Sequence, residues 1–392
     1  MTPVSTAVAR PADLAEARSV MAASAERGQE VVIKGGGTKQ DWGVPGPSPE
    51  LVVDTTGLDA LVAHNHGDLT AVVGAGMALS TLQARLGEAG QWLALDPPSV
   101  AEGATVGGLL ATGDAGPRRH RYGTMRELAI GATVVLADGT VGRSGGQVIK
   151  NVAGYDLAKL LCGSLGTLGL VTEVSLRLHP LAPASATVRA ETGPGPATRA
   201  VLEVLAGPAM PTAIDWAEGA LWVRLEGTTA GVRSQAEEVA AVARRTVGSA
   251  EMIEGDAEAA AWTGLGGRAA GGDTVAWAAT LPGQLGEAAE ALTRAAGEAG
   301  VQAELTSRAG LGLHAARLSG GGVAAQAATV VAWREAVARL GGTVVVRRRP
   351  PELAALVDLW GPAPEAVTVM RRVKEQLDPS GRLGRGRFSP WW

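Results

Sequence analysis

Short apolar runs alternate with amphipathic stretches along the first 180 residues, a pattern typical of a chain that mixes strands and helices. The apolar runs predict strands over 31–33, 51–53, 69–73, 132–136 and 170–178. Helices are predicted over 11–27, 58–63, 79–86 and 155–162. Thr105 is suited to cap a further short helix, and Asp138-Gly139 predicts a hairpin turn.

A second pattern begins after Pro180. Residues 181–198 hold three prolines and many small residues, which suggests a domain junction. The elements that follow are predicted in the order βαββαβ, over 274–280, 284–300, 301–307, 312–319, 323–340 and 343–347. That order is typical of a ferredoxin-like sandwich, to which a strand at 221–225 and a helix at 232–247 can add. Helices at 352–359 and 364–377 then lead to a loop at 378–381, and no internal repeat stands out.

Composition narrows the class of protein without naming a function. The chain has 392 residues, a net charge of −4 and one cysteine, Cys162. The length suggests two domains or slightly more, and the charge gives no reason to expect nucleic-acid binding. A disulfide framework is excluded. We expect no signal peptide and no membrane span, because no basic-then-apolar start and no apolar stretch of about 20 residues is present.

Glycine is concentrated in three segments at the edges of predicted strands or helices. These are Gly35-Gly36-Gly37-Thr38-Lys39, Ala104-Thr105-Val106-Gly107-Gly108, and residues 163–169, with glycine at every third position. Consecutive glycines let backbone N–H groups converge on an anion such as a diphosphate. The first segment is neither a Walker loop nor the dinucleotide fingerprint. A tight turn or a close helix–strand contact is the alternative for any one segment.

Together, in this order and spacing, the three segments resemble the FAD domain of the vanillyl-alcohol-oxidase family, the p-cresol methylhydroxylase (PCMH) type. Further segments are similar to the E subunits of bacterial glycolate oxidases: 116–119 with Gly123 and Arg126-Glu127, 150–157, 359–362 and 374–388. This resemblance implies an α+β protein. It places a PCMH-type FAD-binding domain of two α/β subdomains at 1–182, a ferredoxin-like cap at 183–350, and a helical segment at 351–392 that returns to the FAD domain.

The resemblance also implies which residues contact FAD. In the family the first segment binds the pyrophosphate, and the other two line the adenine, ribose and flavin. The expected contacts are Lys34, Gly35, Gly36, Gly37, Thr38, Lys39, Pro98, Ala104, Thr105, Gly107, Gly108, Gly163, Gly166, Thr167, Gly169 and Val171.

Two departures from the family pattern change the expected chemistry. The first segment lacks the histidine that bonds covalently to the flavin in many relatives, and Cys162 is not at the position of the second covalent bond, so we expect non-covalent FAD. The C-terminal loop of relatives often carries an Asn-Pro pair, which Gly384-Arg385 replaces here. Because of this replacement, FAD binding by this chain and substrate oxidation by this chain are two separate expectations.

Oxidation of a 2-hydroxy acid needs a cation for the carboxylate and a base for the hydroxyl proton. Arg118, Arg119 and His120 are the candidates, and an ion pair or a subunit contact is the alternative for the arginines. The chain has five scattered histidines, so we expect no metal site.

By resemblance, the expected function is oxidation of glycolate or a similar short 2-hydroxy acid. The resemblance also implies two partners, a larger FAD subunit and an iron–sulfur subunit. With one cysteine, this chain cannot ligate a cluster by itself. A stand-alone 2-hydroxyacid dehydrogenase and a non-catalytic flavin-binding scaffold are the alternatives. The expected location is cytoplasmic, with contact to the inner face of the membrane only through partners.

Overall fold

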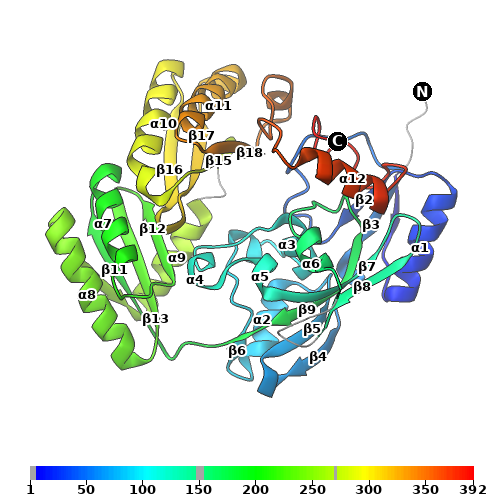
Figure 1. Cartoon of the computed structure of the whole chain (residues 1–392), viewed down its shortest axis with the longest axis horizontal. Helices are drawn as coiled ribbons and strands as arrows, with labels where there is room; N and C mark the ends of the chain where they lie inside the picture. The colour runs from blue at the N-terminus through cyan, green and yellow to red at the C-terminus, as the bar shows by residue number, and fades with distance from the viewer. Residues whose placement is uncertain (1–5, 147–153, 269–271) are drawn as a thin grey trace.

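The computed structural model describes residues 6–146, 154–268 and 272–392, arranged as two lobes (Figure 1). The first lobe contains the N-terminal sheets and the returning C-terminal segment. The second lobe is one large sheet with its helices. Among the described residues, no helix is long and apolar enough to cross a membrane.

A small parallel sheet opens the first lobe, with strand order β1-β3-β2: β1 (Ala7–Ala9), β3 (Leu51–Asp54) and β2 (Val31–Lys34). Helix α1 (Leu14–Glu26) begins at Asp13, whose carboxylate accepts a hydrogen bond from the Glu16 amide. Its buried Ala17 and Met21 pack on β2 and β3 side chains and on Leu170 of the neighbouring sheet. One apolar core thus joins the small sheet to the larger one.

The second sheet of this lobe is five-stranded and antiparallel, in the order β4-β5-β9-β7-β8. Its strands are β4 (Leu61–Asn65), β5 (Thr70–Gly74), β9 (Leu170–Arg177), β7 (Ala129–Val135) and β8 (Val141–Gly145). Helices α2 (Leu79–Gly87), α3 (Val106–Thr112), α5 (Met125–Leu128) and α6 (Leu157–Leu161) contribute buried leucines to its core. A two-stranded ribbon, β6 (Gln91–Trp92) with β10 (His179–Pro180), completes the lobe.

Most predicted elements of this lobe are confirmed, including the hairpin between β7 and β8. The helix expected over 58–63 is wrong, since a 3₁₀ turn (Thr55–Gly57) is followed directly by β4. Apolar residues at 58, 61 and 62 do not distinguish a helix from a short strand. Pairing with β5 decided the outcome.

The second lobe is built on an eight-stranded antiparallel sheet, in the order β14-β11-β13-β12-β16-β17-β15-β18. Its strands are β11 (Ala184–Glu191), β12 (Ala213–Ala217), β13 (Ala220–Gly227), β14 (Glu251–Glu254), β15 (Thr274–Ala279), β16 (Gln302–Arg308), β17 (Leu313–Ser319) and β18 (Thr343–Arg348). The helices are α7 (Pro194–Ala206), α8 (Thr229–Val247), α9 (Gly255–Arg268), α10 (Leu285–Ala299) and α11 (Gly322–Arg339).

This sheet consists of two ferredoxin-like units. The predicted βαββαβ unit is confirmed as β15-α10-β16-β17-α11-β18. The chain before it forms the same motif, β11-α7-β12-β13-α8-β14, with the corresponding strand order. Strands β12 and β16 meet at the centre, where Trp216 lies opposite Ser307. Only β13 and α8 of the first unit are predicted from the sequence, so the repeat was missed.

Residues after β18 return to the first lobe (Figure 1). The helix predicted over 352–359 is only a 3₁₀ turn (Pro351–Ala355), whereas α12 (Val367–Leu377) matches its prediction. Leu383 forms a parallel bridge with Val31 of β2. Lys374 of α12 donates to the Thr167 carbonyl at 2.7 Å and to Asp378 Oδ2 at 2.6 Å. The side chain of Asp378 is fully buried, so this ion pair fastens the segment inside the lobe.

Lys374→Met should lower the free energy of unfolding by about 3–5 kcal/mol, because it leaves the buried Asp378 carboxylate without its cation. Chemical denaturation with a probe of the first lobe measures this. Lys159→Met is the matched control: Lys159 forms a half-exposed pair with Asp156, which contributes about 1 kcal/mol or less. Equal effects of the two substitutions would contradict the anchoring role of Lys374.

Candidate functional site: a cofactor cleft and its neighbour

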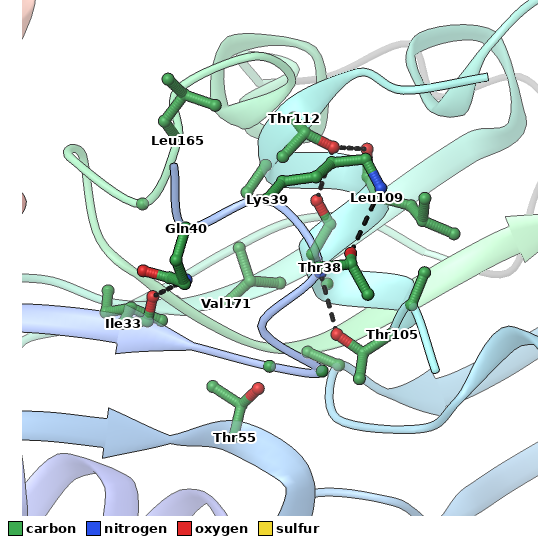
Figure 2. A pocket seen from close by; sticks show the side chains of 18 of the residues that line it. Ile33, Thr38, Lys39, Gln40, Thr55, Thr105, Leu109, Thr112, Leu165 and Val171 are labelled. Atoms are coloured by element: carbon green, nitrogen blue, oxygen red, sulfur yellow. Dashed lines mark hydrogen bonds between the residues drawn. The ribbon is translucent and has the colours of Figure 1, made fainter. Parts of the chain in front are cut away.

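The three glycine segments meet around one cleft in the first lobe (Figure 2). The cleft contains about 730 Å³ of space between its walls, including space open to solvent. It is lined by Ile33, Gly35, Gly36, Gly37, Thr38, Lys39, Gln40, Thr55, Ala75, Ala104, Thr105, Gly107, Gly108, Leu109, Ala111, Thr112, Ser164, Leu165, Gly166, Gly169, Val171 and Arg387.

The first segment follows β2 and crosses very close to the second. A Cβ on Gly36 would lie 1.9 Å from the Gly103 carbonyl oxygen, so only glycine fits there. The backbone amides of residues 36–39 donate to no acceptor among the described residues. Successive free amides of this kind form an anion-binding concavity. The turn is held partly by Gln40, whose side chain donates to the Ile33 carbonyl (Figure 2).

The second segment places a helix start at the cleft. Thr105 caps α3, its hydroxyl accepting a hydrogen bond from the Gly108 amide at 3.3 Å, as predicted. A Cβ on Gly107 would lie 2.7 Å from that of Ala75, so glycine lets α3 approach β5. The glycines of the second segment therefore allow close helix–strand packing. The same packing forms the wall of the cleft at which the free amides of residues 36–39 lie.

The third segment approaches the cleft from the other side with left-handed backbone at Leu165 and Gly166. Gly166, Gly169 and Val171 line the cleft as expected, together with Ser164. Gly163 and Thr167 do not, because they line a separate apolar groove beside α12. The Thr167 hydroxyl donates to the Ser164 carbonyl, and its side chain is buried.

Two other expected contacts also lie outside this cleft. Lys34 ends β2 with an exposed side chain, and Pro98 lines a neighbouring cleft. Several lining residues were not identified from the sequence: Ile33, Gln40, Thr55, Ala75, Leu109, Ala111, Thr112, Ser164, Leu165 and Arg387. Most carry no chemical signature, and their position depends on tertiary packing.

Lys39 does not offer a free positive charge to a diphosphate. Its ammonium lies 3.0 Å from Asp114 Oδ2, and both side chains are about nine-tenths buried. It also donates to the hydroxyls of Thr38 and Ser99. Lys39 therefore fixes the wall between the two clefts, and the amides of residues 36–39, rather than its paired ammonium, are the donors without acceptors at the first cleft.

Arg387 closes the edge of the first cleft from the C-terminal segment. Its guanidinium donates to the Trp42 carbonyl at 3.1 Å and to Gln40 Oε1 at 2.6 Å. Burial lowers the pKa of Arg387, with Asp41 opposing the shift. Gly384, at the departure from the family pattern, donates its amide to the Val31 carbonyl, and Arg385 points outward to Glu30.

The structure places the three catalytic candidates on or beside α4 (Arg119–Tyr122), between the lobes. Arg118 is held by Glu226 of β13 at 2.6 Å and lies 3.6 Å from Asp96. The ion-pair alternative therefore applies to Arg118, and its guanidinium is not available for a substrate. His120 packs on Gly310, and its Nδ1 is buried without a partner among the described residues. Burial, then Arg121, lowers the pKa of His120.

The second cleft lies between the lobes and shares Thr38 and Lys39 with the first. Its cap side is formed by Trp277 of β15, Arg308 of β16 and Arg347 of β18. Arg347 lies between two indoles, with its Cζ 4.6 Å from the ring centres of both Trp42 and Trp277. Burial lowers the pKa of Arg347 to about 10; Asp114 opposes the shift, and Arg308 and Arg119 add to it. No histidine or tyrosine among the described residues lines either cleft.

The remaining histidines are in structural positions. His314 lies buried in the cap between the hydroxyls of Thr280 and Ser307, and burial lowers its pKa to about 4. His64 stacks on His66 and bonds to Gln91. Within 6–146, 154–268 and 272–392, no three histidine, cysteine or acidic residues are grouped to hold a metal ion.

Asp215 of β12 is a buried carboxylic acid near the lobe interface. It is 3% exposed, and its Oδ1 has no partner among the described residues. Burial raises the pKa of Asp215 to about 7, although Arg308 opposes the shift.

Asp215→Asn should stabilise the protein above pH 7. A raised folded-state pKa means that the carboxylic acid contributes stability below pH 4, and that this contribution is lost as the pH rises through 7. The loss amounts to about 4 kcal/mol at 1.36 kcal/mol per pKa unit. The difference in thermal midpoint between variant and parent should grow from pH 4 to pH 8. The exposed Asp59→Asn should show a flat difference, and a flat difference for Asp215→Asn would contradict the prediction.

The fold and the cleft together define the class of protein. Residues 5–145 match the family described as the FAD binding domain. The structure also resembles a solved structure of alkyldihydroxyacetonephosphate synthase, with a TM-score of 0.71 at 16% identity, over 96% of this chain and 75% of that one. Residues 5–145 are therefore similar to an FAD-binding domain, which supports FAD as the cofactor, and the fold is of the predicted α+β, PCMH-type class.

Three curated relatives show which enzymes the chain is similar to in sequence. Glycolate oxidase subunit GlcE of Escherichia coli is 36% identical over 207 residues, covering 53% of this chain and 59% of the relative. D-lactate dehydrogenase of Archaeoglobus fulgidus is 36% identical over 173 residues, covering 44% and 38%. Glycolate oxidase subunit GlcD of Bacillus subtilis is 33% identical over 174 residues, covering 44% and 37%. The chain thus spans between about two fifths and three fifths of the length of these relatives.

Arg387→Ala should weaken FAD binding about 10-fold, because a charged donor that orders the first glycine turn is lost. Fluorescence titration of the apoprotein with FAD gives the dissociation constant. Arg385→Ala is the matched control two residues away, with a side chain 66% exposed, and should leave the constant unchanged. An unchanged constant for Arg387→Ala would remove this residue from the cofactor site.

Proposed function

We propose that this protein is the FAD-binding subunit of a glycolate oxidase-type complex that oxidises glycolate or a similar short 2-hydroxy acid. The observation that carries the proposal is the pairing of an FAD cleft with a cation-rich cleft that shares its wall at Thr38 and Lys39. The curated relatives, two glycolate oxidase subunits and a D-lactate dehydrogenase, support this substrate class.

FAD, when bound, supplies a two-electron acceptor. One C–H and one O–H bond of the hydroxy acid break and a C=O bond forms, so two electrons and two protons leave the substrate. The free amides of 36–39 would hold the diphosphate of the cofactor, and the cap residues that line the second cleft would shield the substrate from solvent. The electrons then pass to partners, which we propose to be a larger FAD subunit and an iron–sulfur subunit on the cytoplasmic side of the membrane.

The absence of histidine and tyrosine from the described walls of both clefts favours a second candidate, a subunit whose flavin does not oxidise substrate itself. Anaerobic mixing of the FAD-loaded chain with glycolate or D-lactate separates the two. Bleaching of the flavin band near 450 nm supports oxidation at this subunit. Bleaching only after the partners are added supports the second candidate, and none in the full complex would overturn the proposed substrate class.

FAD should be released intact when the protein is precipitated with acid. No histidine or cysteine lines the described walls of the cofactor cleft, and Cys162 faces the groove beside α12. The supernatant should contain all of the flavin, measured by its absorbance, and the pellet should be colourless. Flavin that remains with the pellet would show a covalent bond.

A further inference from the structure

The second cleft contains two arginines that are fixed in place but not neutralised. Arg308 is 5% exposed, and its Nη1 has no hydrogen-bond partner among the described residues. Its Cζ lies 5.3 Å from the ring centre of Trp277, the same indole on which Arg347 stacks. The N–H donors of a guanidinium lie in its own plane, so a guanidinium packed over an indole keeps its edge for hydrogen bonds.

Charge at this cleft is unbalanced in favour of an anion. Arg308, Arg347 and Arg348 all line it from the second lobe. Among the buried acids nearby, Asp114 is already paired with Lys39. Asp96 and Asp215 interact with Arg308 only from beyond ion-pair distance, and Asp96 is also held by Arg118. Asp41 and Glu102 also line the cleft, but both are exposed, where water screens them. A buried guanidinium without a counter-charge is costly, so a bound anion would stabilise this arrangement.

The diphosphate of FAD has its own site. The free amides of 36–39 face the first cleft, whereas Arg308 and Arg347 line only the second. The two clefts touch at Thr38 and Lys39, so an anion held by the arginines would lie beside the first cleft, against the end of the first glycine segment.

We propose that Arg308 and Arg347 form the clamp for the carboxylate of the substrate, with Trp277 as the platform that orients both guanidiniums. A planar carboxylate accepts the parallel hydrogen bonds that a guanidinium edge offers. This inference rests on the proposed function for the identity of the substrate, and it moves the substrate cation from Arg118, which is tied to Glu226, to the cap.

Oxalate, a short carboxylate without an oxidisable hydroxyl, is the probe. Calorimetric titration of the FAD-loaded chain should show binding that Arg308→Gln and Arg347→Gln each weaken 10- to 100-fold, the range of one charge-assisted hydrogen bond. Arg308→Lys should be intermediate. Arg189→Gln is the matched control, because Arg189 also stacks on an indole, that of Trp222 at 5.2 Å, but does not line the cleft. It should bind oxalate normally.

Three results would overturn the clamp. These are an unchanged oxalate constant in both glutamine variants that melt like the parent, loss of FAD affinity together with oxalate affinity, and inorganic phosphate binding as tightly as oxalate. Failure of the clamp is distinguishable from failure of the proposed function. Turnover of glycolate with an unchanged KM in Arg308→Gln would contradict the carboxylate clamp and leave the proposed function intact. Oxalate binding that depends on the arginines, with no flavin reduction by any 2-hydroxy acid even when partners are present, gives the opposite outcome. It would contradict the proposed function and leave the anion site intact.

Discussion

The structure depends on the close approach of two backbone segments in the first lobe. The first glycine segment lies against residues 103–105, at a distance that a single Cβ on Gly36 would prevent. This contact positions the start of α3 beside the end of β2 and leaves four amides without internal acceptors. Successive unpaired amides form a concavity that attracts an anion, so the same constraint that shapes the cleft also makes it favour an anionic ligand.

The C-terminal segment fixes the shape of the cleft, because its side chains bond to the loops that form the walls. Lys374 holds the carbonyl of Thr167, which belongs to the third glycine segment, and Arg387 holds the turn that follows the first. Residues more than 200 positions apart are thus joined within one small region. Because the cap lies between them in the sequence, the returning segment also limits how the cap can be placed against the first lobe (Figure 1).

Local patterns predicted the parts of the molecule in which local chemistry decides the outcome. Periodicity and turn residues identified the strands at the glycine segments and one ferredoxin-like unit. They also identified Thr105 as the N-cap residue of α3. The first ferredoxin-like unit could not, because β11 and α7 lie in a stretch whose prolines resemble a linker. Arg308 and Arg347 were missed for another reason. Nothing in the sequence shows that they share Trp277, since the pairing of β15 with β17 and β18 creates that contact.

The two groups of arginine at the lobe interface show how charge can separate a structural role from a binding role. Arg118 lies in an alternating series with Asp96, Glu226 and Arg224, and each charge in that series has an opposite neighbour within 3.6 Å. Such a series holds the cap on the first lobe and leaves no donor for a ligand. Arg308 and Arg347 instead both contact the indole of Trp277, and neither has a carboxylate within ion-pair distance among the described residues. The lobe interface therefore carries uncompensated positive charge beside the cofactor cleft. A small anion bound there would balance this charge.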